Sequence, residues 1–394
     1  MSVAKQIEAI LEQASWIRRM FEEGARLKAK HGPENVFDFS LGNPNVPPPA
    51  QLRDTLCSVA AASQPSDHGY MANIGYLSVR QSIAPAVSRE QAVTVTADEI
   101  IMTCGAAGAL NVILKAILDP GDEVITPAPY FVEYGFYAGN HGGVLKPVPT
   151  LGDFALDVRA IQNAVTPRTK AILVNSPNNP SGQVYSADSL NELAVMLEAE
   201  STRLRRNIYL ISDEPYRKIV FDAITVPPLF SIYPDSIIAT SYSKDLSIPG
   251  ERIGFLAVNP RAAHKASLLA GMALANRILG FVNAPAFMQR VIQALQGVSV
   301  DPAAYQAKRD LLCEGLSAAG YEFVKPKGAF YLFPKAPTAD DVAFVSALQE
   351  ELILTVPGRG FGAPGYFRIA YCVEDATITN ALPGFARVMR RFQT

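Results

Sequence analysis

The sequence has little charge and no surplus of either sign. Charged residues make up 18% of the 394 residues, and 35 lysines and arginines stand against 37 aspartates and glutamates, for a net charge of −2. A surface that binds nucleic acid or an anionic membrane needs a basic surplus that this chain lacks. We therefore expect neither nucleic acid nor a membrane among its partners.

Cysteine and histidine are scarce and scattered, without a CxxC pair or the spacing of metal ligands. The residues are Cys57, Cys104, Cys313, Cys372, His31, His68, His141 and His264. This pattern predicts no metal site and favours reduced thiols in a cytoplasmic protein. Long apolar runs are also missing: no stretch approaches the roughly 18 residues of a membrane span, and the N-terminus does not resemble a signal peptide.

The chain is long enough for two domains, and its pattern changes along the sequence. From about residue 97 to 260, short apolar runs alternate with helical periods, which predicts α/β layers around a largely parallel sheet. The expected strands are EIIMTC, EVITPAP, KAILVNSP, NIYLISD, SIIATSYS and IGFLAVN, and the expected helices are GAAGALNVILKAIL and SADSLNELAVMLEAE, the second with a serine cap. After about residue 285 the pattern is that of a smaller α+β unit. We expect a large domain over 46–284 and a small domain formed by 1–45 and 285–394. The apolar residues at helical spacing near the N-terminus are Ile7, Ile10, Leu11, Ala14 and Ile17.

The predicted strands end in residues suited to a ligand, and ligands bind at the carboxyl ends of strands in open α/β sheets. These ends offer small residues that open a helix, an aromatic cluster, two amides, a carboxylate, a lysine and an arginine. In that order they are Gly105–Gly108, Tyr130–Tyr134, Asn178–Asn179, Asp213, Lys244 and Arg252. Small residues let backbone N–H groups approach an anion, and a buried carboxylate needs a cation. Pyridoxal 5′-phosphate (PLP), a phosphorylated, cationic, aromatic aldehyde, fits the whole set.

Motifs in a fixed order extend this interpretation over nearly the whole chain. They are GNP, YMANIGYLSVR, NNPSG, DEPY, SYSKDLSIPGERIGF, GAFYLFP and PGRGFG followed by YFRIAY. Together they resemble the class I/II aminotransferases, PLP enzymes of fold type I that include aspartate aminotransferase. The resemblance implies an α/β fold with a mostly parallel sheet between helices in the large domain. It also implies ping-pong exchange of an amino group between an L-amino acid and a 2-oxo acid.

By this resemblance Lys244 is the catalytic residue: it holds PLP as an aldimine and moves the proton on the way to a pyridoxamine intermediate. A lysine that must be neutral at those moments needs a pKa lowered from about 10.4, by burial and by the nearby Arg252. Asp213 would keep the pyridinium nitrogen protonated. Asn179 and Tyr216 would hydrogen-bond the phenolic oxygen of the cofactor.

The resemblance also implies how the rest of the cofactor is held. The phosphate would lie among backbone at the start of a helix and three side chains, at Ala106, Ala107, Gly108, Ser241, Ser243 and Arg252. Common family members often carry a hydroxyl or amide side chain in that helix start, so here only its backbone can contribute. Phe131 matches the aromatic residue that stacks on the ring.

Two further matches concern the substrate and the partner subunit. Arg368 matches the residue that grips the substrate α-carboxylate, since its planar fork makes two parallel charge-assisted bonds. Gly42 and Asn179 would contact the same carboxylate. Tyr70 matches a tyrosine that reaches the phosphate bound by the neighbouring subunit, which implies a homodimer with shared active sites.

Other functions remain open at this stage. A PLP-dependent lyase or synthase keeps the same cofactor residues. A non-catalytic sensor behind a DNA-binding domain is disfavoured, because only about forty residues precede LGNP. GRGFG resembles a dinucleotide fingerprint but lacks the following helix and acidic residue.

The sequence leaves the substrate side chain open. A dicarboxylate would need a second cation, for which Arg277 and Arg290 are the candidates, although both are typical of a helix surface. The frequency of such donors in the family favours aspartate or a broad range.

Overall fold

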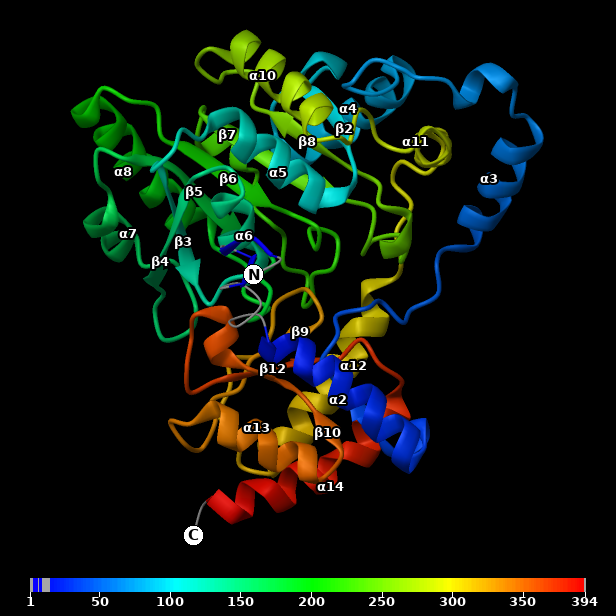
Figure 1. Cartoon of the computed structure of the whole chain (residues 1–394), viewed down its shortest axis with the longest axis vertical. Coiled ribbons are helices and arrows are strands. Elements are labelled where there is room, and N and C mark those ends of the chain that lie inside the picture. The colour runs from blue at the N-terminus through cyan, green and yellow to red at the C-terminus, as the bar shows by residue number, and fades with distance from the viewer. Residues whose placement is uncertain (1–2, 6, 9–14, 393–394) are drawn as a thin grey trace.

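The computed structural model describes residues 3–5, 7–8 and 15–392, and it shows a sheet-bearing part above a smaller part (Figure 1). Three of the N-terminal positions with helical spacing, Ile10, Leu11 and Ala14, lie outside the described residues. The helix that follows them, α2, covers Ser15–His31 and lies in the smaller part.

A seven-stranded sheet forms the centre of the upper part. Its spatial order is β2 (Ile100–Thr103), β8 (Gly254–Val258), β7 (Ser236–Ser241), β6 (Tyr209–Asp213), β5 (Thr169–Asn175), β3 (Glu123–Ala128) and β4 (Val144–Pro149). Only β8 runs against the others. The predicted mostly parallel sheet is confirmed, and six of its strands coincide with predicted apolar runs. Strand β4 was not predicted, because its residues are only patchily buried and form no clear apolar run.

Helices cover both faces of this sheet because its strands are apolar on both sides. On one face Met102, Leu210 and Ile238 pack in one core cluster. On the other face Ile101, Ile211 and Ile237 pack in another. The helices of the upper part are α3 (Ala50–Ala61), α4 (Leu77–Gln91), α5 (Gly105–Ile117), α6 (Glu133–Gly139), α7 (Val158–Ala164), α8 (Ala187–Leu204), α9 (Leu229–Ile232), α10 (Lys265–Ile278) and α11 (Ala286–Gln293).

Two of these helices were predicted from their periodicity and are confirmed. Helix α5 buries Leu110, Ile113 and Leu114. Helix α8 begins at the predicted serine cap, where the Ser186 side chain accepts a hydrogen bond from the backbone N–H of Ser189.

The smaller part combines short strands with long helices. Strands β1 (Phe37–Asp38) and β10 (Ile353–Leu354) pair in parallel, and a three-stranded antiparallel sheet has the order β11 (Val356–Pro357), β12 (Phe367–Ala370), β9 (Tyr331–Leu332). The helices are α12 (Pro302–Ala318), α13 (Asp341–Glu350) and α14 (Asp375–Phe392). Residues before 45 share this core, since Leu27, Val36 and Phe39 pack with it.

The change from one core to the other falls later than the expected boundary at 284/285. Helix α11 packs its apolar face, with Met288, Val291 and Ile292, into the core beneath the large sheet. The small core takes over at Val300. Because an amphipathic helix does not reveal which core it faces, the sequence could not place this boundary.

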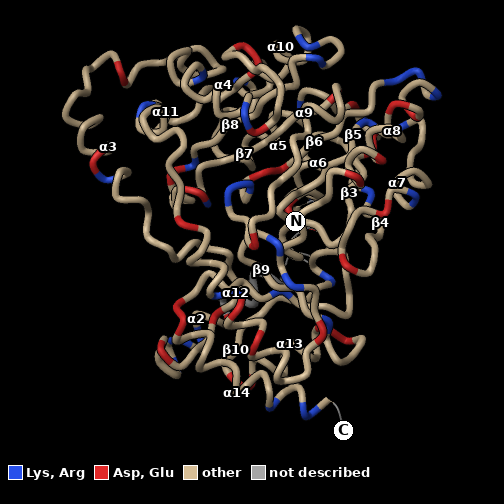
Figure 2. Tube along the Cα trace, turned by 180° about the vertical axis from the view of Figure 1, so that it is seen from behind, with Lys and Arg blue, Asp and Glu red and all other residues tan. Residues whose placement is uncertain are grey.

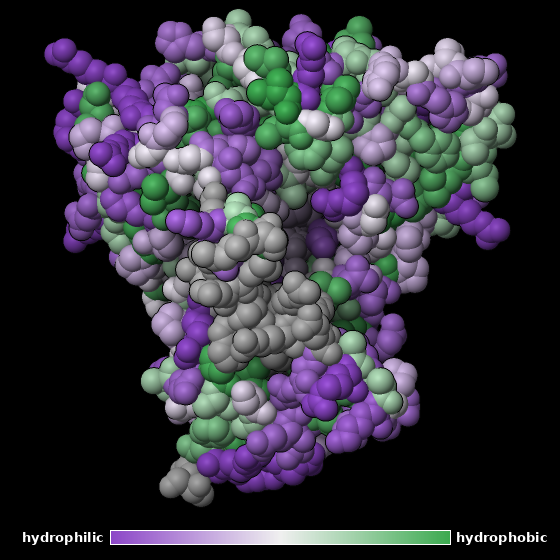
Figure 3. All heavy atoms as spheres, in the orientation of Figure 1, coloured by the Kyte–Doolittle hydropathy of each residue, from purple (hydrophilic) through white to green (hydrophobic). Residues whose placement is uncertain are grey.

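Basic and acidic residues are interspersed along the trace of both parts of the described chain (Figure 2). Hydrophobic atoms gather over α10 (Figure 3), where Leu274 and Ile278 are exposed. Among the described residues, no helix has the length and apolarity needed to cross a membrane, and no group of His, Cys, Asp or Glu side chains is placed to hold a metal ion.

Candidate active site

The carboxyl ends of the parallel strands open into a cavity of about 390 Å³ between the two parts. Strand register explains this convergence: Asn175, Asp213 and Ala239 are neighbours across β5, β6 and β7. The predicted residues that line the cavity are Gly42, Ala106, Ala107, Phe131, Asn179, Asp213, Tyr216, Ser241, Ser243, Lys244, Arg252 and Arg368. They come from both parts of the molecule.

Lys244 follows β7 and points its amine across the cavity. Its Nζ donates a hydrogen bond of 3.0 Å to the backbone carbonyl of Gly42 and lies 5.3 Å from the centre of the Phe330 ring. Burial lowers the pKa of Lys244 to about 8; Cys372 acts in the opposite direction, and the positive charges of Arg252 and Arg368 add to the lowering. The pKa of Lys244 is therefore lowered in the expected direction, with burial as the main cause.

Asp213 ends β6 as a buried carboxylate with one internal donor. The Tyr134 hydroxyl donates to Asp213 Oδ2 at 2.6 Å, while Oδ1 is buried without a partner among the described residues. Asn175 fixes the backbone, since its amide donates to the Asp213 carbonyl at 2.8 Å. Burial raises the pKa of Asp213 to about 7, the Tyr134 hydrogen bond opposes the rise, and Glu214 adds to it. Among the described residues, no cation pairs with this buried carboxylate.

Backbone and basic groups meet at the start of α5. Gly105 has φ +73°, and a Cβ there would lie 3.3 Å from Arg252 Nη2, so the guanidinium lies against the first residue of the helix. Gly254 lets the start of β8 lie close to the start of α5, because a Cβ on Gly254 would lie 2.3 Å from the Thr240 carbonyl oxygen and 2.9 Å from Gly105 Cα. Ser241 and Ser243 line the same end of the cavity. A helix N-terminus beside an arginine and two hydroxyls is an arrangement suited to an anion.

Arg368 reaches the cavity from β12 and is held on several sides. Its Nη1 donates to Asn179 Oδ1 at 3.1 Å and its Nη2 to the Ser40 carbonyl at 2.6 Å. The guanidinium lies 4.9 Å from the centre of the Tyr331 ring and 4.8 Å from that of Phe361. These contacts fix the plane of the fork in a position to receive a carboxylate.

The two residues expected to touch the phenolic oxygen have partners of their own. The Asn179 side chain accepts from Arg368, and its backbone N–H donates to Asn175 Oδ1 at 2.7 Å. The hydroxyls of Tyr216 and Tyr331 share a hydrogen bond of 2.8 Å. The wall of the cavity therefore links the large-sheet residues to β9 and β12.

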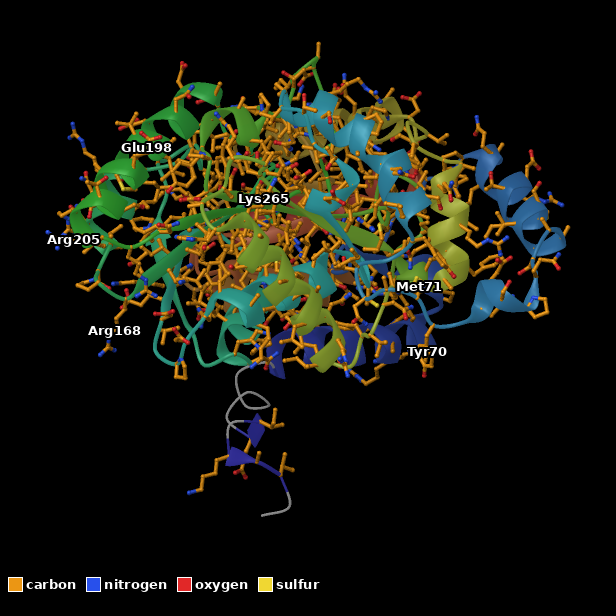
Figure 4. The ribbon with its side chains drawn as sticks, turned by 90° about the horizontal axis from the view of Figure 1, so that it is seen from above. Tyr70, Met71, Arg168, Glu198, Arg205 and Lys265 are labelled. Atoms are coloured by element: carbon orange, nitrogen blue, oxygen red, sulfur yellow. The ribbon has the colours of Figure 1, made fainter. Side chains whose placement is uncertain are left out.

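Two expected residues lie outside the cavity. Gly108 is buried in α5, where a Cβ would lie 3.3 Å from Cys104 Cβ, so the absence of a side chain serves packing and the residue does not line the cavity. Tyr70 is 93% exposed and lies at the edge of the molecule in Figure 4. Its expected role depends on a second subunit.

Comparisons with known proteins agree with this geometry. Residues 34–385 match the family model described as aminotransferase class I and II. The aspartate/prephenate aminotransferase of Thermus thermophilus is 33% identical over 370 residues, which cover 91% of this chain and 92% of the relative. The chain belongs to the class I and II aminotransferases.

Solved structures give the same result. An aminotransferase from Eubacterium rectale is 40% identical, with a TM-score of 0.95 and full coverage of both chains. The aspartate aminotransferase of Thermus thermophilus, solved with maleate, is 28% identical, with a TM-score of 0.87 over 98% of this chain and 100% of the other. The fold-type-I expectation is confirmed.

An enzyme of this family depends on PLP, and the cavity of this aminotransferase fits that cofactor. The unpartnered Asp213 Oδ1 suits a protonated ring nitrogen. The start of α5 beside Arg252 suits a phosphate, and Phe131 supplies an aromatic face in the lining. Lys244 supplies an amine whose pKa is already lowered.

Several site residues of this aminotransferase were not predicted from the sequence. Tyr134 belongs to the aromatic cluster that was noticed, and its buried hydroxyl requires an acceptor, which is the one usable signal. Tyr331 stands in the quoted GAFYLFP motif, but its pairing with Tyr216 spans 115 positions and leaves no local pattern. Glu133 and Tyr137 also line the cavity, one turn apart on α6.

Proposed function

We propose that this aminotransferase works by a ping-pong mechanism, in which an α-amino acid and a 2-oxo acid use one cavity in turn. The observation that carries the proposal is the convergence of Lys244, Asp213 and Arg368 on the same cavity. PLP, when bound, supplies an electrophilic carbon and a ring that withdraws electrons from the substrate α-carbon. The chain itself supplies orientation, charge and proton transfer.

In this proposal Lys244 is the proton carrier. Because burial lowers its pKa to about 8, a far larger fraction of the Lys244 amine is neutral near pH 7.5 than at an ordinary lysine pKa. The neutral amine would take a proton from the substrate α-carbon. The resulting ammonium would return that proton to the cofactor carbon that receives the nitrogen. The Gly42 carbonyl, which accepts from Nζ at 3.0 Å, orients the amine.

Asp213 and Arg368 hold the two ends of the reacting assembly. Asp213, aligned by Tyr134, would accept a hydrogen bond from the protonated ring nitrogen of the cofactor and so maintain its positive charge. Arg368 would bind the α-carboxylate of either substrate through its fork. The backbone of Ala106 and Ala107, with Ser241, Ser243 and Arg252, would hold the phosphate, and Phe131 would supply an aromatic face for the ring.

We further propose a cytoplasmic homodimer with shared active sites. Supporting a dimer, Tyr70, Leu77, Leu274 and Ile278 are exposed at 93%, 53%, 54% and 58%. Asn276 ties these regions together, because its amide donates to the Asn73 carbonyl at 2.7 Å. In the dimer Tyr70 would reach the phosphate site of the partner. The four free cysteines are compatible with a reducing compartment.

The test is the half-reaction. The purified enzyme with PLP receives a single amino acid and no oxo acid, and its visible absorbance is followed. We expect conversion of the cofactor to its amino form with one oxo acid released per site, and steady-state kinetics with parallel double-reciprocal lines. Release of ammonia instead would establish the lyase alternative and contradict the proposal.

A further inference from the structure

The cavity contains one charged side chain that the proposed function does not use. Within the described part of the chain its charged lining consists of Glu133, Asp213, Lys244, Arg252 and Arg368. The last four hold the ring nitrogen, move the proton, bind the phosphate and bind the α-carboxylate. Glu133 is left over.

Glu133 has no cation near it. No hydrogen bond or ion pair joins the Glu133 carboxylate to another described residue. The side chains of Asp213, Lys244 and Arg368 form their hydrogen bonds with other groups. Burial alone raises the pKa of the Glu133 carboxyl. An acidic residue is common in the first turn of a helix because it favours the helix dipole, but that interaction would lower its pKa. Glu133 is thus a partly desolvated acceptor that faces the cavity.

The surroundings of Glu133 describe the group that it would meet. Leu41, Leu110 and Val132 line the cavity with apolar surface, and Tyr137 lies one turn further along α6. Burial raises the pKa of Tyr137; the negative charges of Glu133 and Asp213 add to the rise and the positive charge of Arg252 opposes it, so Tyr137 lies near all three. An apolar wall with an anionic acceptor fits an aliphatic stem that ends in N–H donors.

The cations considered for a second substrate carboxylate do not enter this cavity. Arg290 is paired with Asp67 at 2.9 Å and with the Ser63 hydroxyl at 3.2 Å. Arg277 is exposed at the end of α10. Neither residue is part of the lining. In the described chain, a distal carboxylate would meet the Glu133 anion without a compensating charge, which is strongly unfavourable.

We propose that Glu133 selects the amino donor, favouring a side chain that ends in a cationic nitrogen, such as an ammonium or guanidinium group, and rejecting dicarboxylates. This inference rests on the proposed function, because it assumes that the donor is an amino acid bound through Arg368. The selectivity is a difference of affinities, in which an attraction and a repulsion act through the same carboxylate.

The test compares wild-type enzyme, E133Q and a matched control, D188N, all loaded with PLP. Asp188 is an exposed carboxylate in the first turn of α8, so D188N makes the same chemical change at a helix start remote from the cavity. The donors are ornithine, arginine, leucine and aspartate, assayed for kcat/KM. The analogues α-methylornithine and α-methylaspartate lack the α-proton, so the cofactor absorbance reports their binding without turnover.

We expect wild-type enzyme to favour ornithine or arginine over aspartate. E133Q should lower kcat/KM for the cationic donors by about 10- to 100-fold, since an ion pair with the cationic nitrogen is replaced by a hydrogen bond to a neutral amide oxygen. It should raise kcat/KM for aspartate and leave leucine nearly unchanged, and the affinities of the two analogues should shift in the same directions. D188N should match wild type throughout.

The inference would be overturned if the ratio of kcat/KM for a cationic donor to kcat/KM for aspartate were the same in wild type and E133Q. It would also be overturned if wild-type enzyme preferred aspartate and E133Q kept that preference. Either result would leave the aminotransferase mechanism intact. Analogue binding that follows the Glu133 charge without any oxo acid formed from any donor would support the inference and contradict the proposed function. The two claims can therefore fail separately.

Discussion

Asp213 and Arg368 are buried charges of opposite sign in one cavity, and the chain supports them differently. Asp213 ends β6 in the large sheet, and its carboxylate receives a single hydrogen bond from the described residues, that of Tyr134. Arg368 comes from β12 in the small sheet and has two acceptors and two aromatic rings around it. The carboxylate thus lacks a cation until the cofactor provides one, whereas the guanidinium is positioned by the protein. In the proposed function, the cofactor would complete the Asp213 end, whereas protein contacts already orient the guanidinium at the Arg368 end.

The largest effect is expected at Lys244, which lies between these two ends. K244A should lower kcat by about a thousandfold or more, because the proton carrier is removed. The cofactor should stay bound through Asp213 and the phosphate site but without covalent attachment, so borohydride should fix it to wild type only. K115A, an exposed lysine on α5, is the control. Turnover like that of wild type in K244A would remove the assignment.

The same variant sharpens the dimer proposal. If Tyr70 serves the partner's site, mixed dimers of K244A and Y70A contain one complete site. An equal mixture of the two weakly active variants should then recover about a quarter of wild-type activity once subunits exchange. Random pairing makes half of the dimers mixed, and one of the two sites in each mixed dimer is complete. No recovery despite proven subunit exchange would place Tyr70 outside the shared site.

The next effect is expected at the substrate end. R368A should lower kcat/KM for every amino acid by about 100- to 10,000-fold, the loss of two charge-assisted hydrogen bonds worth about 3–6 kcal/mol. R368K keeps the charge without the fork and should fall between R368A and wild type. Cofactor affinity should stay unchanged in both variants. A KM that R368A leaves unaltered for all donors would place the α-carboxylate elsewhere.

A smaller effect is expected at the cofactor end, in the stability of the enzyme stripped of PLP. The folded-state pKa of Asp213, about 7, lies above its ordinary value of 3.8. The folded state therefore binds more protons than the unfolded state between about pH 4 and 7, and its stability falls as pH rises through that window. D213N lacks this carboxyl, so the fall in its free energy of unfolding across the window should be smaller than that of wild type by up to about 4 kcal/mol. Urea unfolding of both proteins from pH 4.5 to 8 measures the difference, and parallel curves would contradict it.

Parallel-sheet geometry explains why much of the site could be predicted. Adjacent parallel strands bring their carboxyl ends to one edge, so Asp213 and Lys244 could be grouped from the order of apolar runs alone. Arg252 reaches the same edge because it precedes β8, which runs antiparallel. Motif resemblance added Arg368 and Gly42. In the fold, the same alternation of runs identified six strands of the sheet and the helices α5 and α8.

The remaining features depend on contacts without a local pattern. Tyr134 and Glu133 lie on a helix of seven residues, where a shift of one position would turn either side chain away from the cavity. Tyr331 belongs to a two-residue strand whose place is set by the small core. Gly108 shares its small size with Ala106 and Ala107, but the turn of α5 directs it into packing.

The most direct measurement of the contrast between the two ends is the titration of the Asp213 carboxyl itself. Carbon-13 NMR of the enzyme with labelled aspartate, assigned by the signal lost in D213N, follows this group with and without PLP. We predict titration near pH 7 in the protein stripped of PLP and an ionised carboxylate down to about pH 4 in the PLP-bound enzyme. Titration near pH 4 in both forms would show that the chain satisfies Asp213 by itself, and would contradict the account.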